Sequence, residues 1–514
     1  MKYLSKSDVF MEAEINLQLY FTSDMHGYLL PVDYAQGGKQ NTGLLSCAKS
    51  FKKDGNTLII DAGDTLQGSP FAAYLTTQPQ GAKHIAAALN KAGYDYITLG
   101  NHDFNYGISY LQSYLGALNA TCICANVTGD LPLAPHTIHT LENGLKVGIV
   151  GIVTSRINIW EPPENLEGVT ITDPFPAVKE ALAKLKGHTD INICIYHGGF
   201  ECDLDTDILL DATSENVGSK ICRELDFDLL LTGHQHNHIE GRMLHGTYIV
   251  QPRPNATHYI LIKGTMTEAG MKFSSTTHTP DGTYCPEGIE AIHDTDAKVQ
   301  TWLDIPVGQL DKPLPVKDRV EMALQGSAIA DFFNQLQLEA TGADISCTSL
   351  SNQLPGFSRE VRTRSIIANY PFSNDLITLE VTGEVLRQIL ERAATYLDLD
   401  KNGKPIVSDT FLLPKIEHYN YDFFAGLTYT ANLHLPPGQR VQEIIVNGRK
   451  VNPQDKFSLC TSHYRASGTG GYDVYQECPI LKREPTDISE LMRKYISMQE
   501  VTATKRYPAP KFIY

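Results

Sequence analysis

Short runs of apolar residues recur along the first half of the chain, and most are followed at once by a short polar loop. The runs at 15–21, 58–60 and 94–98 are rich in leucine, β-branched and aromatic side chains, and their length predicts buried strands. Residues 81–92 have apolar side chains at helical spacing and are followed by Gly93, a residue typical of helix C-termini. The pattern therefore predicts an α/β unit. Its further expected strands are 145–153, 191–196, 229–232, 248–250 and 259–262, with the last two forming a hairpin-like pair.

The second half of the chain mixes helical and extended patterns, which predicts a second domain. Residues 276–288 are rich in Thr, Pro, Asp and Gly and are typical of a surface connection, and a helical segment follows at 289–304. We therefore expect a catalytic domain at 1–288, a linker helix at 289–307 and a C-terminal domain at 308–514. The elements expected in the C-terminal domain are helices 323–341 and 383–397 and strands 376–381, 427–433 and 444–446.

The loops after five of the predicted strands carry His, Asp or Asn side chains. Asp24 and His26 lie two residues apart on an extended segment, so their side chains point to the same side and can share one ion. Asp61 and Asp64 both follow the strand at 58–60, and their spacing alone does not choose between them. In an open α/β sheet, such loops form the edge at which ligands bind. The ligand residues expected there are Asp24, His26, Asp64, Asn101, His197, His234 and His236.

Nitrogen and oxygen ligands of this kind suit two divalent first-row ions, with one carboxylate able to bridge them. Two such ions about 3.5–4 Å apart lower the pKa of a bound water towards about 7, which supplies hydroxide for attack on phosphorus. His102 follows one expected ligand but is outside the ligand pattern, so it is placed to give a proton to the leaving oxygen. Each loop alone is more typical of a turn or a helix cap. Their joint occurrence after five strands favours a metal site.

The charge of the chain limits the partners that we expect. A formal net charge of −16 argues against a nucleic-acid polymer, because such partners are bound by basic surfaces. A small phosphate ligand remains compatible, since metal ions or a few arginines can balance its charge locally. The ten cysteines form no CxxC pair and are interpreted as reduced, mostly buried thiols.

The sequence shows neither a transmembrane segment nor a secretion signal. No run of 18 apolar residues is present, and residues 1–14 carry charged residues in place of the apolar core of a signal peptide. We therefore expect a cytoplasmic protein without membrane association, or an extracytoplasmic one if a leader was removed from this chain. No feature of the sequence indicates an obligate protein partner.

Five loop motifs follow one another along the first half of the chain: Asp24-x-His26, Gly63-Asp64-x-x-x-Gly68, Gly100-Asn101-His102-Asp103, His197 and Gly233-His234-x-His236. These motifs resemble those of the calcineurin-like metallophosphoesterases. The chain as a whole is similar to the bacterial 5'-nucleotidase and 2',3'-cyclic-nucleotide 2'-phosphodiesterase/3'-nucleotidase group. This resemblance implies a four-layer α/β/β/α sandwich for the N-terminal half and a C-terminal α+β nucleotide-binding domain.

The resemblance also implies how the metal ligands are shared. The bridging carboxylate of the family lies in the Gly-Asp motif, which is Asp64 here, and Asp61 becomes a structural residue. Two divalent ions, Mn²⁺, Zn²⁺ or similar, are then expected. The ligands of one ion are Asp24, His26, Asp64 and His236, and those of the other are Asp64, Asn101, His197 and His234.

Two aromatic residues sandwich the nucleotide base in the family, and the matching positions are Tyr421 and Tyr464. Tyr464 lies in the segment 463–468 together with Gly468, which the resemblance also assigns to substrate binding. Stacking suits a nucleotide because every base has a π-face, and it contributes roughly 1–3 kcal/mol per base.

Two departures from the 5'-nucleotidase pattern bear on the substrate. Asn105 stands where 5'-nucleotidases place an Asp beside the catalytic histidine, and an Asn can orient an imidazole without stabilising its charged form as a carboxylate does. Residues 349–354 replace the Asn-x-Gly-Gly-x-Arg segment. We therefore expect a two-metal hydrolase of nucleotide phosphate esters that favours 2',3'-cyclic nucleotides and 3'-nucleotides. The alternatives are a 5'-nucleotidase or nucleotide-sugar hydrolase, or a nucleotide-binding sensor without activity.

Overall fold

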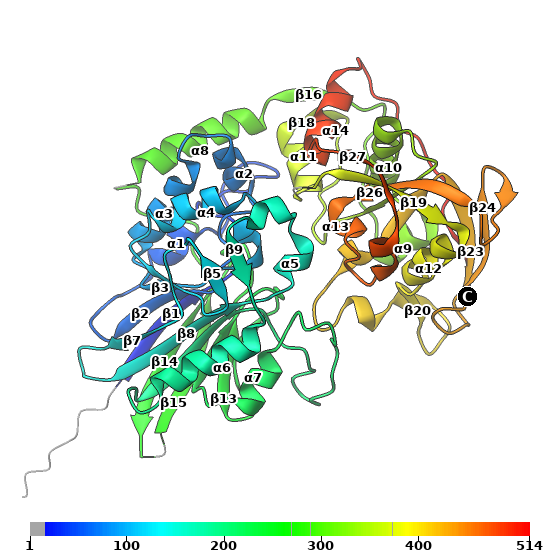
Figure 1. The fold of residues 1–514 in the computed structure, drawn as a ribbon. Helices are drawn as coiled ribbons and strands as arrows, with labels where there is room; N and C mark the ends of the chain where they lie inside the picture. Colours follow the sequence, from blue (N-terminus) through cyan, green and yellow to red (C-terminus); the bar gives the residue numbers. More distant parts are fainter. Residues whose placement is uncertain (1–15, 269, 288, 373) are drawn as a thin grey trace, which may run out of the picture.

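Two stacked sheets form the N-terminal half of the protein in a computed structural model, which describes residues 16–268, 270–287, 289–372 and 374–514 (Figure 1). Expectations for the N-terminus at 1–15 and for residue 288 lie outside the described residues. The first sheet has the strand order β15 (Gly270–His278), β14 (Tyr259–Thr267), β1 (Asn16–Thr22), β2 (Thr57–Asp61), β3 (Tyr96–Ile97), β4 (Thr121–Ile123) and β6 (Leu133–Ala134). The second has the order β12 (Ile239–Leu244), β13 (Thr247–Gln251), β11 (Leu229–Thr232), β10 (Ile191–His197), β8 (Lys146–Val153) and β7 (His136–Thr140).

Alternating side chains on each central strand build the layers. On β1, Leu19 packs between the two sheets with Ile193 of β10, while Tyr20 faces the helices on the outer side of the first sheet. On β10, Cys194 faces the helices that cover the second sheet. Burial of both faces explains the continuous apolar runs, and the four layers confirm the predicted α/β/β/α sandwich. The covering helices are α1 (Leu44–Ala48), α2 (Pro70–Thr76), α3 (Gly81–Ala92) and α4 (Ile108–Leu115) on one side and α6 (Pro174–Leu185) and α7 (Gly218–Glu224) on the other.

The expected hairpin-like pair at 248–250 and 259–262 is wrong. β13 pairs with β11 and β12 in the second sheet, whereas β14 pairs with β1 and β15 in the first. The segment between β13 and β14 passes from one sheet to the other. Apolar patterning locates both strands, but it does not say which sheet each one joins.

The C-terminal half is an α+β domain, as predicted. Its five-stranded sheet has the order β22 (Asp422–Ala425), β17 (Ile345–Ser349), β26 (Lys456–Ser462), β19 (Leu376–Thr382) and β27 (Ile480–Glu484). A four-stranded sheet has the order β25 (Arg449–Lys450), β24 (Val441–Val446), β23 (Leu427–Asn432) and β28 (Lys511–Ile513). Its helices are α9 (Arg319–Gln325), α10 (Ala328–Thr341), α11 (Thr363–Asn369), α12 (Gly383–Ala394), α13 (His463–Ala466) and α14 (Ile488–Ser497). Three two-stranded ladders complete the fold: β5 (Val127–Gly129) with β9 (Val169–Ile171), β16 (Pro306–Gln309) with β18 (Glu360–Arg362), and β20 (Leu397–Leu399) with β21 (Pro405–Val407).

The single helix expected at 323–341 is two helices in the structure. α9 ends at Gly326, whose φ of 80° breaks the helical path. Ser327 then caps α10, because its Oγ accepts the backbone N–H of Ala330 at 3.4 Å. The change of direction places α10 against the five-stranded sheet.

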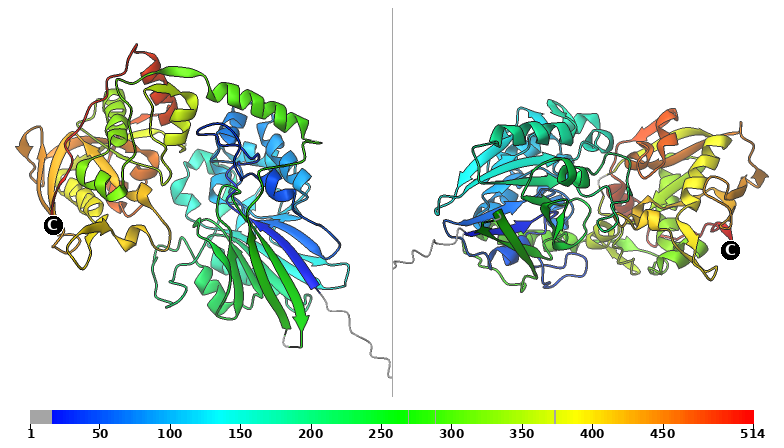
Figure 2. Two further views of the ribbon diagram at one scale, coloured as in Figure 1. Left: turned by 180° about the vertical axis from the view of Figure 1, so that it is seen from behind. Right: turned by 90° about the horizontal axis from the view of Figure 1, so that it is seen from below.

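Helix α8 (Glu290–Leu303) connects the two halves, which lie side by side in all views (Figure 2). Arg364 of α11, in the C-terminal half, contacts both the end of α8 and the N-terminal half. Its Nη2 donates to Oδ1 of Asp304, just after α8, at 2.8 Å, and its Nη1 donates to the Tyr34 carbonyl oxygen at 2.9 Å. The domain boundaries at 288 and 307 stay a prediction.

No helix among the described residues has the length and apolar character needed to cross a membrane. The ten cysteines are all free thiols, eight of them buried, which confirms their interpretation as reduced side chains.

Candidate metal centre

The expected metal ligands converge at the carboxyl ends of strands from both sheets. Six of the seven are buried, and only the side chain of His236 is substantially exposed, at 39%. The loops after β1, β2, β3 and β11 and the last residue of β10 supply Asp24, His26, Asp64, Asn101, His197, His234 and His236.

A left-handed backbone is common to five of these seven residues. Values of φ are 53° for Asp24, 49° for His26, 58° for Asp64, 68° for His234 and 58° for His236. Each such conformation costs of the order of 1–3 kcal/mol and persists only where the surroundings impose it. Strained backbone of this kind clusters at ligand-binding sites, which supports a functional origin for the loops.

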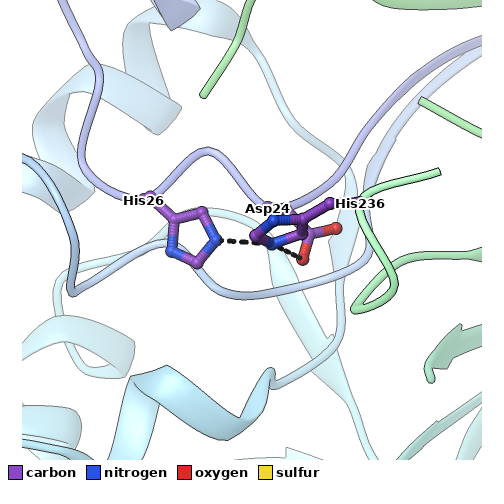
Figure 3. A group of neighbouring side chains, drawn as sticks. All are labelled: Asp24, His26 and His236. Carbon is purple, nitrogen blue, oxygen red and sulfur yellow. Dashed lines mark hydrogen bonds and ion pairs between the residues drawn. The ribbon is translucent and has the colours of Figure 1, made fainter. Parts of the chain in front are cut away.

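The first group consists of Asp24, His26 and His236 (Figure 3). His26 Nε2 and His236 Nε2 lie 3.0 Å apart, and His236 Nε2 lies 3.3 Å from Asp24 Oδ1. The three side chains point toward one another in Figure 3. Their ligand atoms are therefore gathered around one point, as a single ion requires.

The second group consists of Asp24, Asp64 and His197, so Asp24 belongs to both groups. Asp64 Oδ2 lies 3.2 Å from His197 Nε2, which in turn lies 3.2 Å from Asn101 Oδ1. Asn101 Oδ1 is also 2.9 Å from His234 Nδ1. Asp64 Oδ2 lies 4.0 Å from His26 Nε2 of the first group, so this carboxylate faces both groups.

The ring nitrogens and carboxylate oxygens that face one another in the cluster form a ligand set suited to a cation. His26 Nδ1 donates to the Gln67 carbonyl oxygen at 2.9 Å, and His197 Nδ1 donates to the Ala62 carbonyl oxygen at 2.7 Å. In the neutral rings, Nε2 is then a lone-pair donor that faces other nitrogens or carboxylate oxygens. A divalent cation satisfies such a set without further hydrogen atoms, and the N and O donors suit Mn²⁺ or Zn²⁺.

The charge states of three ligands agree with this arrangement, and that of His197 differs. Burial lowers the pKa of His197, but Asp64 outweighs it and raises the value to about 9, so a cation bound at Nε2 would have to displace a proton. Burial lowers the pKa of His26 to about 4, so its ring is neutral as a metal ligand must be. Burial alone raises the pKa of Asp24, but His236 and His197 outweigh it and hold the carboxyl below its ordinary value. Asp64 likewise keeps a pKa well below its ordinary value, because His197 and His102 outweigh burial.

Glu215 orients one ligand, and the sequence analysis missed it. His234 Nε2 donates to Glu215 Oε1 at 2.7 Å, which leaves Nδ1 facing Asn101. A carboxylate behind a ligating imidazole fixes its tautomer and increases its basicity. Trp160 stacks on the same ring, with centroids 5.5 Å apart. Glu215 lies in an irregular segment without periodicity, so no sequence signal could have identified it.

Asp61 and Asp103 hold the loops rather than facing the cluster. Asp61 accepts hydrogen bonds from Thr22 Oγ1 at 2.7 Å and from the Gly63 N–H at 2.9 Å. Asp103 accepts from the backbone N–H groups of Asp64, Thr65, Leu66 and Gly100. Both carboxylates therefore use their acceptor atoms to fix the ligand loops.

His102 lies at the edge of the cluster. Its backbone N–H donates to Asp64 Oδ1 at 2.7 Å, and its ring centroid is 5.5 Å from that of His26. Its Nδ1 is 2.8 Å from Asn105 Oδ1, which leaves Nε2 available to a substrate. The proton-donor role stays a prediction.

The structure places the two predicted base-stacking residues in different surroundings. Tyr464 is partly exposed, whereas Tyr421 is 3% exposed and stacks on Tyr396 with ring centroids 4.3 Å apart. Tyr419, two residues earlier, is partly exposed. Burial and Glu417 raise the pKa values of both Tyr419 and Tyr464, with a further contribution from Glu215 beside the cluster. Base stacking by Tyr421 stays a prediction, but its packing favours Tyr419 for that role.

Gly468 lies four residues after Tyr464 and has a φ of 87°. Its backbone N–H donates to the Arg465 carbonyl oxygen at 3.0 Å, which closes the turn after α13. A Cβ at this position would lie 2.7 Å from Gln476 Nε2, so glycine fits the turn for both reasons. Its contact with substrate stays a prediction.

Two cations approach the cluster, one from each half of the chain. Burial raises the pKa of Glu215, but His234, Lys415 and Arg156 outweigh it and lower the value to about 2. Lys415 Nζ also lies 6.0 Å from the centroid of the Tyr419 ring. Arg156 Nε is buried and has no hydrogen-bond partner among the described residues. Positive charge from both halves of the chain therefore lies close to Glu215, beside the ligand set.

Comparison with known proteins identifies both halves. Residues 17–238 match the calcineurin-like phosphoesterases, and residues 306–477 match the C-terminal domain of 5'-nucleotidases. A Staphylococcus aureus protein described provisionally as a 5'-nucleotidase, solved with alpha-ketoglutarate, is 31% identical and superposes with a TM-score of 0.89 over 97% of this chain and 99% of its own.

Two curated relatives span nearly the whole chain. The 2',3'-cyclic-nucleotide 2'-phosphodiesterase/3'-nucleotidase of Salmonella typhimurium is 23% identical over 97% of this chain and 88% of its own length. The trifunctional nucleotide phosphoesterase YfkN of Bacillus subtilis is 24% identical over 96% of this chain, which spans only 38% of YfkN. The chain thus belongs to the 5'-nucleotidase group of calcineurin-like phosphoesterases, enzymes that use divalent metal ions to hydrolyse nucleotide phosphate esters.

Proposed function

We propose that this enzyme holds two divalent ions and hydrolyses 2',3'-cyclic nucleotides and 3'-nucleotides. The observation that carries the two-metal proposal is the position of Asp64 Oδ2, 3.2 Å from His197 Nε2 and 4.0 Å from His26 Nε2. A carboxylate in that position can serve both ligand groups. The proposed ligands are Asp24, His26, Asp64 and His236 for one ion and Asp64, Asn101, His197 and His234 for the other.

Ions bound here would supply Lewis acidity and a nucleophile at neutral pH. The side chains of the chain would supply the rest of the chemistry. His102 would give a proton to the leaving ribose oxygen through Nε2, since its Nδ1 is engaged by Asn105. Lys415 and Arg156 would offset the negative charge of the phosphate, because both lie close enough to Glu215 to lower its pKa.

The base would stack between Tyr419 and Tyr464. Both rings are partly exposed, and both are close enough to Glu215 for its charge to raise their pKa values. A nucleotide held by these rings would thus have its phosphate near the metal ligands. Stacking of this kind tolerates different bases, so we expect modest base preference.

Asn105 supports the preference for 2',3'-cyclic nucleotides and 3'-nucleotides. It occupies the position at which 5'-nucleotidases are expected to have Asp, and its Oδ1 accepts from His102 at 2.8 Å. The name of the Salmonella relative points in the same direction. The alternative that one observation favours is a 5'-nucleotidase, because the Staphylococcus aureus protein with 31% identity is described in that way.

A substrate panel with metal analysis on the same sample tests the proposal. The protein is loaded with Mn²⁺ or Zn²⁺ and assayed at equal concentrations of 2',3'-cyclic AMP, 3'-AMP, 5'-AMP and a nucleotide sugar. We expect close to two ions per chain and the highest kcat/KM on the first two substrates. A higher value on 5'-AMP would favour the 5'-nucleotidase, and no turnover of any nucleotide would overturn the proposal.

A further inference from the structure

Asn105 connects His102 to the partly buried carboxylate of Glu161. Asn105 Oδ1 accepts from His102 Nδ1 at 2.8 Å, and Asn105 Nδ2 donates to Glu161 Oε1. Glu161 Oε2 accepts from Asn165 Nδ2 at 2.9 Å. Glu161 follows α5 (Ile157–Trp160), and Asn165 lies in the short 3-10 helix η2 (Pro163–Leu166). The imidazole and the carboxylate are thus joined through one amide group.

The direction of this chain of hydrogen bonds is set by Glu161. Both of its oxygens receive an amide N–H, an arrangement that suits the carboxylate rather than the acid. The Asn105 amide must then turn Nδ2 toward Glu161 and Oδ1 toward His102. A carbonyl oxygen only accepts, so His102 carries a proton on Nδ1 and Nε2 is the atom that exchanges protons with a substrate.

The electrostatic setting agrees with an interaction across the amide. Burial raises the pKa of Glu161 above its ordinary value, while Asn165 and the charge of His102 oppose that rise. The Glu161 carboxylate therefore lies close enough to the imidazole for positive charge on the ring to stabilise it, although the two groups are not in contact. An amide placed between them passes on the orientation and part of the polarisation that a directly bonded carboxylate would give.

We propose that Glu161 is a positioning residue for phosphoester hydrolysis, which holds the Asn105 amide so that His102 keeps its Nδ1 proton and presents Nε2 to the leaving oxygen. The inference deepens the proposed function and rests on it for the identity of the reaction. The form of His102 that donates is the imidazolium, which carries protons on both Nδ1 and Nε2. As hydroxide forms the new P–O bond and the old one breaks, the electron pair stays on the leaving oxygen, which takes the Nε2 proton and leaves a neutral ring with its proton on Nδ1. Loss of Glu161 should therefore matter most for leaving groups that need this proton.

Leaving-group dependence gives the first test. Glu161→Gln removes the charge, and the new amide can still accept from Asn105. We expect kcat/KM on 3'-AMP to fall about tenfold, a fraction of the 10²–10⁴ that proton transfer supplies. On 4-nitrophenyl phosphate, whose leaving group is stable without a proton, the fall should stay within about twofold. Glu167→Gln, an exposed neighbour, is the matched control and should change neither value.

Exchanging the two groups gives the second test. Asn105→Asp alone places a carboxylate against Glu161, and we expect activity on 3'-AMP to fall because the two charges repel. Asn105→Asp combined with Glu161→Gln restores one carboxylate and one amide in the reverse order, so activity should recover above that of both single variants. A residue that only holds its loop would show no such recovery, and a double variant no better than the single ones would overturn the proposal.

The tautomer of His102 gives a readout that does not depend on turnover. Nitrogen-15 NMR of the Zn²⁺-loaded protein, with the His102 signals assigned by their loss in His102→Gln, should show the proton on Nδ1 in the wild type. The Nδ1-protonated fraction should fall in Glu161→Gln and stay unchanged in Glu167→Gln. An unchanged tautomer in Glu161→Gln would overturn the inference. If the wild type hydrolysed no nucleotide, the proposed function would fail while this measurement still decided the positioning role.

Discussion

Oδ2 of Asp64 lies 3.2 Å from Nε2 of His197. The other nitrogen of that ring, Nδ1, donates a hydrogen bond to the backbone carbonyl oxygen of Ala62. Asp64→Asn keeps the shape of the side chain but removes the charge that two cations would share. We expect metal content to fall below one ion per chain and kcat to fall at least about 100-fold, since a ligand is lost rather than an outer partner. Metal analysis and initial rates on one sample measure both. Asp226→Asn, at an exposed position, should keep metal and activity.

His102→Ala separates metal binding from proton donation. His102 is not among the expected ligands, and only its backbone N–H contacts Asp64. We expect activity on 3'-AMP to fall about 10²–10⁴-fold while metal content stays that of the wild type. A variant that lost its metal together with its activity would place His102 among the ligands instead.

Tyr419→Ala tests which aromatic residue stacks on the base. Loss of one stacking ring is worth roughly 1–3 kcal/mol, so KM for a nucleotide should rise about 5- to 150-fold. KM for 4-nitrophenyl phosphate, which has no base, should change little. Tyr421→Phe keeps the ring that packs on Tyr396 and loses only a 3.5 Å hydrogen bond to the Ala323 carbonyl, so it should leave both values unchanged.

Much of the fold follows from local patterning, because alternation and spacing are properties of neighbouring residues. The strand at 229–232 and the helix at 81–92 have the predicted bounds, and the polar residues after the strands converge as expected. Assignment of strands to sheets failed at 248–250 and 259–262, since sheet membership depends on contacts distant in sequence.

The surroundings of the site were less predictable than its ligands. Glu161 and Glu215 lie in irregular segments, and their roles depend on hydrogen bonds to residues far away in the sequence. Which of Tyr419 and Tyr421 can stack on a base depends on strand register. Asp422 pairs with Ser349 of β17, and Tyr421, the residue before Asp422, packs inward on Tyr396. An aromatic pair separated by one residue carries no signal for that choice.

Lys415→Met tests the role of positive charge beside the ligands. Its ammonium lies 6.0 Å from the Tyr419 ring centroid and contributes to the lowered pKa of Glu215, so it is placed to meet a phosphate. We expect KM for 3'-AMP to rise about fivefold, the loss of roughly 1 kcal/mol that one partly solvated charge contributes. The dependence of KM on ionic strength should weaken as well. Lys401→Met, at an exposed position, should show neither change.

His418 makes the stability of the C-terminal domain depend on pH. Burial, followed by the charge of Arg319, lowers the pKa of His418 from 6.5 to about 4, and its Nδ1 lies 2.7 Å from the Tyr396 hydroxyl. The unfolded chain therefore binds a proton more readily than the folded one between pH 4 and 6.5. The contribution to stability is fully present above pH 6.5 and is lost as the pH falls through this window.

His418→Gln removes that titration while keeping a hydrogen-bonding group near Tyr396. We expect the variant to lose less stability than the wild type between pH 6.5 and pH 4. The difference should be about 1 kcal/mol, because His418 is only half buried and solvent weakens the effect of its charge. Thermal unfolding at half-unit pH steps measures the difference, with His434→Gln as a control at an exposed histidine. Equal pH dependence in wild type and His418→Gln would show that other groups control acid unfolding of this domain.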